Sequence, residues 1–178
     1  YVTCFRGSVE HGIPRDETAA QAWVTVFAEH GIEASVVDVG SRADGDRDGM
    51  RGGRVFLYDA EENWWSRGGG LEGTPVGDPC GPDSEVFYDL GPELHDPSSG
   101  EPHPASEGGR FVEIGNQVFM RYRRTSEGFV LLDEPSPHPG GGLERIAAPA
   151  AATPDGLVRR LPRPPGRASR RVTAHAAL

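Results

Sequence analysis

The chain has 178 residues, enough for one domain with a hydrophobic core and some further length. Hydrophobic residues make up only 36%, and there are 25 glycines and 16 prolines, so we expect part of the chain to lie outside the core. No apolar run reaches the roughly 18 residues that a membrane-spanning helix needs, which argues against a membrane protein.

Charge is spread unevenly along the chain. All 18 basic residues are arginine, which is typical of a bacterium with a GC-rich genome. Residues 1–133 hold 24 acidic residues and 11 arginines, a net charge of −13, whereas residues 134–178 carry a net charge of +4. An acidic folded part favours a basic protein partner and makes nucleic acid an unlikely one.

The first elements are a short strand and the clearest helix. Residues 1–5 read as a strand. A helix is predicted to begin near Asp16, where the helix dipole favours an acid, and to end before Gly31. Its apolar residues recur at a spacing of three and four, which predicts one face packed on the core. These residues are Ala20, Trp23, Val24, Phe27 and Ala28.

Strands and loops follow the helix. Residues 32–39 are apolar enough on both faces to predict a strand inside a sheet. Residues 40–53 read as a polar loop. Residues 54–58 and 85–89 are predicted to be two paired strands joined by a loop of about 25 residues, and loops of that length are often functional.

The last strands are predicted to form an antiparallel meander. Gly115 and Asn116 suit a two-residue hairpin turn between strands 110–114 and 117–122, and a second turn leads to strand 129–133. Residues 134–178 are rich in proline, alanine, glycine and arginine and are predicted to be a disordered tail. The expected fold is therefore an α+β domain of residues 1–133, with one main helix on a mostly antiparallel sheet of about six strands.

One motif indicates a possible metal site. Asp44, Asp46 and Asp48, followed by Gly49, resemble the first half of an EF-hand calcium loop, in which alternate acids supply oxygen ligands. Val55 stands where the bidentate glutamate of such a loop belongs. Calcium is the only cofactor that these residues suggest, and an ordinary polar turn is the alternative.

The long loop offers candidate partner-binding residues. Trp64, Trp65 and Arg67 are of the types that anchor protein interfaces, and glycines 68–70 allow a close approach to the backbone. The alternative is that one tryptophan caps the core while the other is partly exposed. The glycines lack phosphate-loop spacing and have no lysine beside them.

Other patterns with possible chemistry are weaker. His95, Asp96 and His103 share a proline-rich loop but show no metal-ligand spacing. Cys80, followed by Gly-Pro, resembles the nucleophile of papain-like hydrolases, although Gln117 stands where such an enzyme has its histidine. Cys4 and Cys80 could pair, which the sequence alone leaves open.

Two family resemblances concern function. Phe5-Arg6-Gly7 resembles the first strand of arginine-type ADP-ribosyltransferases, which implies a transferase. The second covers about 70 residues: the predicted helix, the strand 32–39, and then an apolar and aromatic pattern from Val55-Phe-Leu-Tyr58 through Trp65-Ser to Glu85-Val-Phe-Tyr88 and Gly91. This order is similar to immunity proteins of bacterial polymorphic toxin systems.

The resulting expectation is a small acidic bacterial protein-binding module, for example an immunity-type protein that neutralises a basic toxin partner. The alternative is an enzyme, a hydrolase or transferase, with its active site in the long loops. No catalytic residue is assigned. A cytoplasmic location is expected, although the chain begins at Tyr1 and a preceding segment or a larger parent protein is left open.

Overall fold

A computed structural model describes residues 1–141. Its secondary structure combines short and long strands with three α-helices and two 3-10 turns. In chain order the elements are β1 (Val2–Phe5), α1 (Glu17–Glu29), β2 (Val36–Gly40), α2 (Arg42–Asp48), β3 (Val55–Tyr58), α3 (Ala60–Asn63), β4 (Trp64–Trp65), β5 (Pro79–Asp89), η1 (Pro92–Leu94), η2 (Pro97–Ser99), β6 (Phe111–Thr125) and β7 (Gly128–Gly141).

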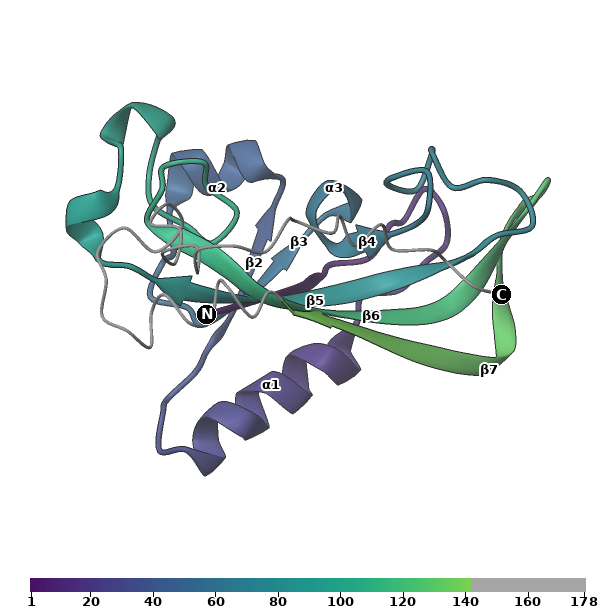
Figure 1. The fold of residues 1–178 in the computed structure, drawn as a ribbon, viewed down its shortest axis with the longest axis horizontal. Coiled ribbons are helices and arrows are strands. Elements are labelled where there is room, and N and C mark those ends of the chain that lie inside the picture. The colour runs from purple at the N-terminus through teal and green to yellow at the C-terminus, as the bar shows by residue number, and fades with distance from the viewer. Residues whose placement is uncertain (142–178) are drawn as a thin grey trace, which may run out of the picture.

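One mixed sheet of seven strands organises this part of the chain. The strand order is β2-β3-β1-β5-β6-β7, and the short β4 pairs with β5 off this path. The pairs β2–β3 and β1–β3 are parallel, whereas β1–β5, β5–β6 and β6–β7 are antiparallel. The predicted α+β class, with one main helix and a terminal meander, is confirmed (Figure 1).

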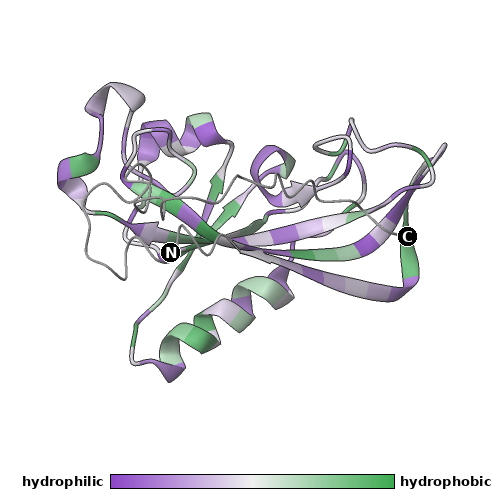
Figure 2. Ribbon diagram, in the orientation of Figure 1, coloured by the Kyte–Doolittle hydropathy of each residue, from purple (hydrophilic) through white to green (hydrophobic). Residues whose placement is uncertain are grey.

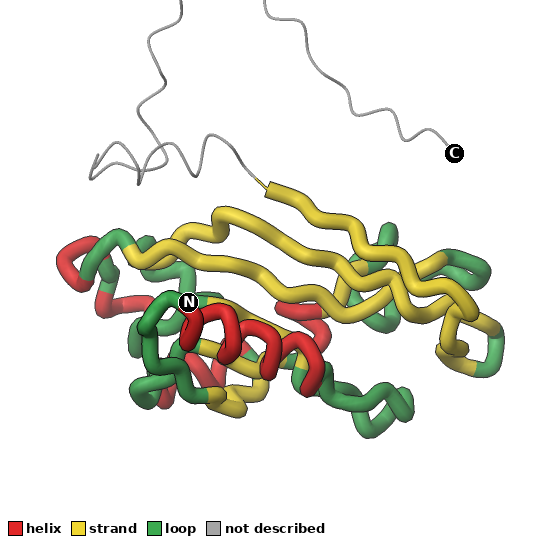
Figure 3. The backbone as a smooth tube through the Cα atoms, turned by 90° about the horizontal axis from the view of Figure 1, so that it is seen from below, coloured by secondary structure: helices red, strands yellow, loops and turns green. Residues whose placement is uncertain are grey.

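Helix α1 covers one face of the sheet, as its apolar spacing predicted. Asp16 caps its first turn by accepting a hydrogen bond from the Ala19 N–H at 3.1 Å. The apolar face packs on a buried cluster that the neighbouring strands supply (Figures 1 and 3). That cluster contains Val2, Cys4, Ala19, Ala20, Val55 and Leu57. No helix within residues 1–141 is long and apolar enough to cross a membrane.

The opposite face carries α2 and α3, and here the sequence prediction of a polar loop was wrong. Ser41 and Asp44 form a capping box that begins α2. Gly45 was a reason to expect a turn, but it gives room for a buried side chain. A Cβ at this position would lie 2.6 Å from the ring of His103, so only glycine lets this ring pack against α2.

The pairing of the central strands also differs from the prediction. The segments 54–58 and 85–89 are not neighbours, because β1 lies between β3 and β5. The strand expected inside the sheet, β2, is an edge strand whose first residue, Val36, is exposed. Figure 2 shows hydrophobic residues on β2, β3 and α1, the region where both faces of the sheet are covered.

The predicted hairpin at Gly115–Asn116 is one continuous strand, β6. Both residues pair with β5 on one side and with β7 on the other, so the ladders hold them extended in place of a turn. The real turn lies between Thr125 and Gly128, as predicted. Strand β7 continues past the expected boundary at Asp133 to Gly141. The rest of the predicted disordered tail, residues 142–178, lies outside the described residues.

Candidate functional site

A cluster of polar side chains lies on the face of the sheet away from α1, where β1, α3, β5 and β6 meet. Asn63 ends α3, and its side chain is fully buried. Asp83 on β5 is 4% exposed, while Glu85 on β5 and Asn116 on β6 are half-buried. The cluster is therefore sealed by the core on one side and reaches the surface beside β6.

The two asparagines hold the buried carboxylate from opposite sides. Asn63 Nδ2 donates to Asp83 Oδ1 at 3.2 Å and to Thr3 Oγ1 at 2.9 Å. Asn116 Nδ2 donates to Asp83 Oδ2 at 3.4 Å and to Glu85 Oε1 at 3.1 Å. The N–H donors of both amide groups are therefore used within the cluster, while their carbonyl oxygens remain available as acceptors.

Those carbonyl oxygens make the cluster rich in acceptors. Asn63 Oδ1 and Asn116 Oδ1 are buried and have no hydrogen-bond partner within residues 1–141. Buried polar atoms are almost always partnered in native proteins, and an unpartnered one costs about 1–3 kcal/mol. Two such oxygens beside a carboxyl group suit a ligand that brings several N–H donors, such as an ammonium group.

The protonation of Asp83 fits the same chemistry. Burial raises the pKa of Asp83 to about 7, and the hydrogen bonds from Asn63 and Asn116 oppose this rise only in part. The carboxyl group is therefore close to half-protonated at neutral pH. A cation placed beside it would favour the charged form and would be bound more tightly for that reason.

The candidate partner-binding residues are separated in the structure. Trp64 is 4% exposed and packs against Phe5, Tyr122 and Phe129, with ring centroids 5.4–5.6 Å apart. Trp65 is half-buried, and Arg67 is exposed and paired with Asp78. The arrangement matches the alternative of one core tryptophan and one partly exposed tryptophan.

The three aspartates of the candidate calcium loop lie on α2 and face different partners. Asp44 pairs with Ser41 and Arg47, which hold its pKa low at about 2. Asp48 also pairs with Arg47, while Asp46 accepts from His103. Among residues 1–141, no group of three or more His, Cys, Asp or Glu side chains is arranged to hold a metal ion.

The side chains of His95, Asp96 and His103 also bind different partners and do not meet at one point. His95 Nε2 bonds to the Gly100 carbonyl, and Asp96 caps the short turn η2. His103 is fully buried, with Nδ1 2.6 Å from the Tyr58 hydroxyl and Nε2 2.8 Å from Asp46 Oδ1. Burial lowers the pKa of His103, against the opposing effect of Asp46, so the ring is neutral at physiological pH.

The cysteines and Arg6 are not placed for the chemistry that the sequence suggested. Cys4 and Cys80 are both free and buried. Burial raises the pKa of Cys80 to about 11, which opposes formation of a nucleophilic thiolate. Arg6 pairs with Asp38 at 3.0 Å.

Sequence reasoning missed Asn63, Asp83, Glu85 and Asn116 as a group. They come from three separate segments, and no local spacing connects them. The available signal was the polar residues that interrupt apolar strands, since a buried polar side chain needs a specific reason. The sequence predicts a turn at Asn116, so its side chain was not expected to lie on a strand beside Asp83.

Comparison with known proteins identifies the class to which the chain belongs. The profile of a family described as tRNA synthetases class II (A) matches residues 20–158, well over half of the chain. The chain therefore belongs to the class II tRNA synthetase family.

Similar individual proteins point to a narrower group within this family. The chain is 41% identical over 129 residues to the alanine–tRNA ligase of Nitrosococcus oceani, which covers 71% of this chain and 13% of that protein. It is 40% identical over 143 residues to the alanine–tRNA ligase of Psychromonas ingrahamii, and 38% identical over 141 residues to that of Solibacter usitatus. These two matches cover 79% and 78% of this chain, and 14% of each ligase. The chain thus spans only a small part of the length of its curated relatives.

These matches correct the functional expectations. The prediction of an immunity-type protein for a basic toxin is wrong, because the family is that of the class II tRNA synthetases. The alternative of a hydrolase or of an ADP-ribosyltransferase-like enzyme is wrong for the same reason. A degenerate pattern of apolar and aromatic positions describes many α+β sheets and does not specify an activity.

The predicted partner is contradicted as well. A basic protein was expected and nucleic acid was considered unlikely, whereas the relatives are named as ligases of tRNA. The error came from summing charge over residues 1–133. Net charge governs long-range, non-specific attraction, but a local patch can oppose it. Arg121, Arg123 and Arg124 lie together on β6 within the acidic part of the chain.

Proposed function

We propose that the chain is the part of an alanine–tRNA ligase that binds the amino acid, and that the cluster around Asp83 holds its ammonium group. The family match and the identity to alanine–tRNA ligases support the activity. The observation that carries the site is the pair of unpartnered buried oxygens, Asn63 Oδ1 and Asn116 Oδ1, beside a carboxyl group. A cytoplasmic location, as expected for an enzyme acting on tRNA, is part of the proposal.

The three N–H bonds of an ammonium group match the acceptors of this cluster in number. One bond goes to Asp83, and the others satisfy the two amide oxygens. Binding then converts the near-neutral Asp83 carboxyl into a carboxylate paired with a cation, which is the stronger form of the contact.

We propose tRNA as the macromolecular partner. The basic residues of β6 lie at the turn end of the antiparallel strands, and Arg123 is exposed there. Guanidinium groups bind phosphates well because of their fixed array of donors. Such contacts weaken as salt rises, so any tRNA binding by this acidic chain should depend strongly on ionic strength.

Calorimetry with L-alanine and with a non-hydrolysable alanyl-adenylate analogue tests the site. We expect both to bind, and Asp83→Asn to weaken them at least about tenfold, or about 1.4 kcal/mol, because the paired charge is lost. The control Glu127→Gln changes an exposed acid by the same charge and should bind like the unmodified chain. Absence of binding by the unmodified chain, or equal binding by Asp83→Asn, would contradict this assignment.

A separate gel-shift titration with tRNA tests the partner. Retardation of tRNA at low salt that is lost in Arg123→Ala is the expected result. If the unmodified chain leaves tRNA mobility unchanged at low salt, the proposed tRNA contact on β6 is refuted, whether or not alanine binds.

A further inference from the structure

A second site is suggested by the topology of the parallel strands. Strands β1 and β3 are parallel neighbours, and the chain leaves their carboxyl ends toward opposite faces of the sheet. From β1 it enters α1 on one face, and from β3 it enters α3 on the other (Figure 1). Such a point, where adjacent connections diverge, opens a crevice that binds ligands in many open α/β sheets.

A cavity of about 460 Å³ occupies this crevice, within the size range of small-molecule sites. A second cavity of about 390 Å³ adjoins it and shares Gly7, Ser8 and Asp59 with it. Three segments line the first cavity: the loop after β1 (residues 7–11), the residues after β3 (59–61) and the glycine-rich loop 69–73. The polar cluster around Asp83 is not part of it.

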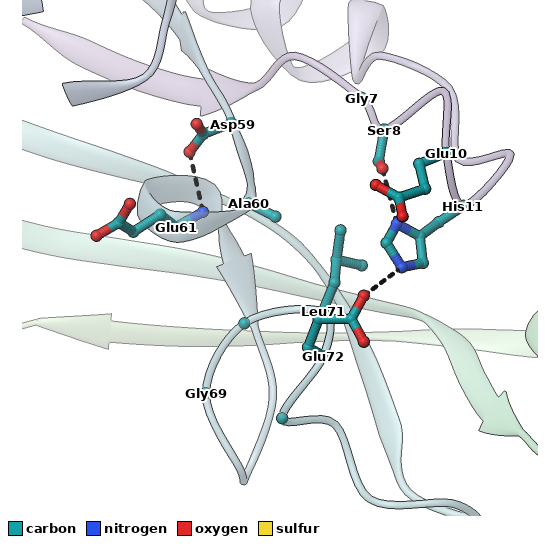
Figure 4. Close-up of a pocket in the computed structure, with 12 residues that line it drawn as sticks. Gly7, Ser8, Glu10, His11, Asp59, Ala60, Glu61, Gly69, Leu71 and Glu72 are labelled. Atoms are coloured by element: carbon teal, nitrogen blue, oxygen red, sulfur yellow. Dashed lines mark hydrogen bonds and ion pairs between the residues drawn. The ribbon is translucent and has the colours of Figure 1, made fainter. Parts of the chain in front are cut away.

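Acidic groups stand at two sides of the cavity with an apolar floor between them. Figure 4 shows Asp59 on one side and Glu10 with Glu72 on the other, while Leu71 and Ala60 lie between. Leu71 is 7% exposed and belongs to the core cluster beneath the cavity. His11 is the only basic residue in the lining, so the cavity is complementary to positive charge.

Two of the three acids are held in place by neighbouring groups. Ser8 Oγ lies 2.9 Å from His11 Nδ1, and His11 Nε2 lies 2.8 Å from Glu72 Oε1, which ties the loop after β1 to the glycine-rich loop. Asp59 Oδ1 caps α3 by accepting from the Glu61 N–H at 3.0 Å, while Oδ2 has no hydrogen bond within residues 1–141. Glu10 likewise has no ion-pair partner in this part of the chain.

We propose that this crevice binds a short aliphatic diamine, with 1,4-diaminobutane as the probe. One ammonium group pairs with Asp59 and the other with Glu10 and Glu72, and the methylene chain packs on Leu71 and Ala60. Of the arginines in the adjoining cavity, Arg6 and Arg15 are both paired with Asp38, and Arg6 also acts electrostatically on Asp59. A diamine satisfies both charged ends at once, whereas a monoamine satisfies one end and leaves the other acidic group unpaired.

Calorimetry on the 178-residue chain tests this with three ligands that share the same four-carbon chain. We expect 1,4-diaminobutane to bind about two- to fivefold more tightly than butylamine, and 1,4-butanediol not to bind, because Glu10 and Glu72 are exposed and an exposed ion pair adds only modestly to affinity. Butylamine or butanediol binding as tightly as the diamine would overturn the proposal, as would absence of diamine binding.

Variants then locate the site. Glu10→Gln and Asp59→Asn should each weaken diamine binding about two- to fivefold. The asparagine can still cap α3, so that variant should fold. Glu127→Gln, far along the chain in the β6–β7 turn, removes the same charge and should bind as the unmodified chain does. If all three variants bind the diamine equally, the binding is non-specific attraction to an acidic protein and the site is refuted. Alanine binding, which belongs to the Asp83 cluster, should stay unchanged in all three.

Discussion

The two halves of the sheet differ in strand length, burial and chemistry. Strands β1 and β3 of the parallel half have four residues each, and every one of these residues is buried. Strands β5, β6 and β7 of the antiparallel half have 11, 15 and 14 residues, and much of β7 is exposed. Figure 3 shows the three long strands running side by side beyond the shorter ones.

This difference means that the parallel half mainly stabilises the fold, whereas the antiparallel half offers surface that can bind a ligand. The parallel half is covered on both faces and is almost wholly apolar, so its residues are chosen by packing. The antiparallel half leaves surface free, and polar groups such as Asn116 and Glu85 can meet a ligand from it. The Asp83 cluster lies where the two halves meet, on strand β5, which pairs with β1 on one side.

The largest expected effect is in the parallel half. Leu57→Ala should reduce the free energy of unfolding by about 2–5 kcal/mol, because the side chain is fully buried under α1 and leaves a cavity. Val130→Ala on β7, where the side chain is 48% exposed, should cost less than about 1 kcal/mol. Urea denaturation of both variants measures the contrast, and equal losses would show that the halves are not divided in this way.

The next effect concerns Asp83, at the boundary of the halves, and depends on pH. The carboxyl group has an ordinary pKa of 3.8, and its folded pKa is raised to about 7. The folded protein holds this proton more tightly, so the stabilisation is fully present below pH 3.8 and is lost as pH rises through about 7.

Asp83→Asn should therefore remove this pH dependence and stabilise the protein at pH 8 by on the order of 2–4 kcal/mol. Thermal denaturation of both proteins between pH 4 and pH 8 measures it. Parallel pH profiles for the two proteins would show that Asp83 is not protonated in the fold at neutral pH.

A smaller effect is expected at the Tyr58–His103 contact. Asp46 can only accept a hydrogen bond, so His103 donates from Nε2 and accepts from the Tyr58 hydroxyl at Nδ1. Tyr58→Phe should cost about 1–3 kcal/mol, because a buried ring nitrogen loses its donor. The loss is measured by chemical denaturation at pH 8, where His103 is neutral in both states. An unchanged midpoint would mean that this bond contributes nothing net.

The smallest effect is expected on the surface of the antiparallel side. Arg67 pairs with Asp78 at 2.6 Å, but its side chain is 74% exposed. Exposed ion pairs contribute roughly 0–1 kcal/mol, so Arg67→Ala should shift the free energy of unfolding by less than about 1 kcal/mol. A greater loss in chemical denaturation would indicate that the 66–78 segment packs more tightly than its exposure implies.

The elements that could be predicted from the sequence are those decided by local pattern. Helix α1 carries its own capping residue, Asp16, and a regular apolar face, so it was found with nearly correct ends. Strand β6 was divided in two because Gly115 and Asn116 favour a turn locally, whereas pairing on both sides holds them extended. Helix α2 was missed because Gly45 is unfavourable in a helix, and its reason for being there, the ring of His103, comes from a distant loop.

The candidate site was beyond local pattern altogether. Asn63 follows a short helix, Asp83 lies in a strand read too short, and Asn116 was placed in a turn. Each is an ordinary polar residue in its own segment. Only the strand order β1-β5-β6 brings them within hydrogen-bonding distance. The sequence predicted this order wrongly, because it paired residues 54–58 with residues 85–89.

The prolines of β7 have a consequence for self-association. Pro137 and Pro139 stand opposite Phe119 and Gln117 in the ladder with β6. Because proline has no N–H to give, its nitrogen is tolerated only on the side that faces away from the neighbouring strand. Within residues 1–141 no strand pairs with the other side of β7, and that side is therefore short of donors at alternate positions. A second copy laid along this edge would find few bonds to form, which protects a long exposed strand from edge-to-edge aggregation.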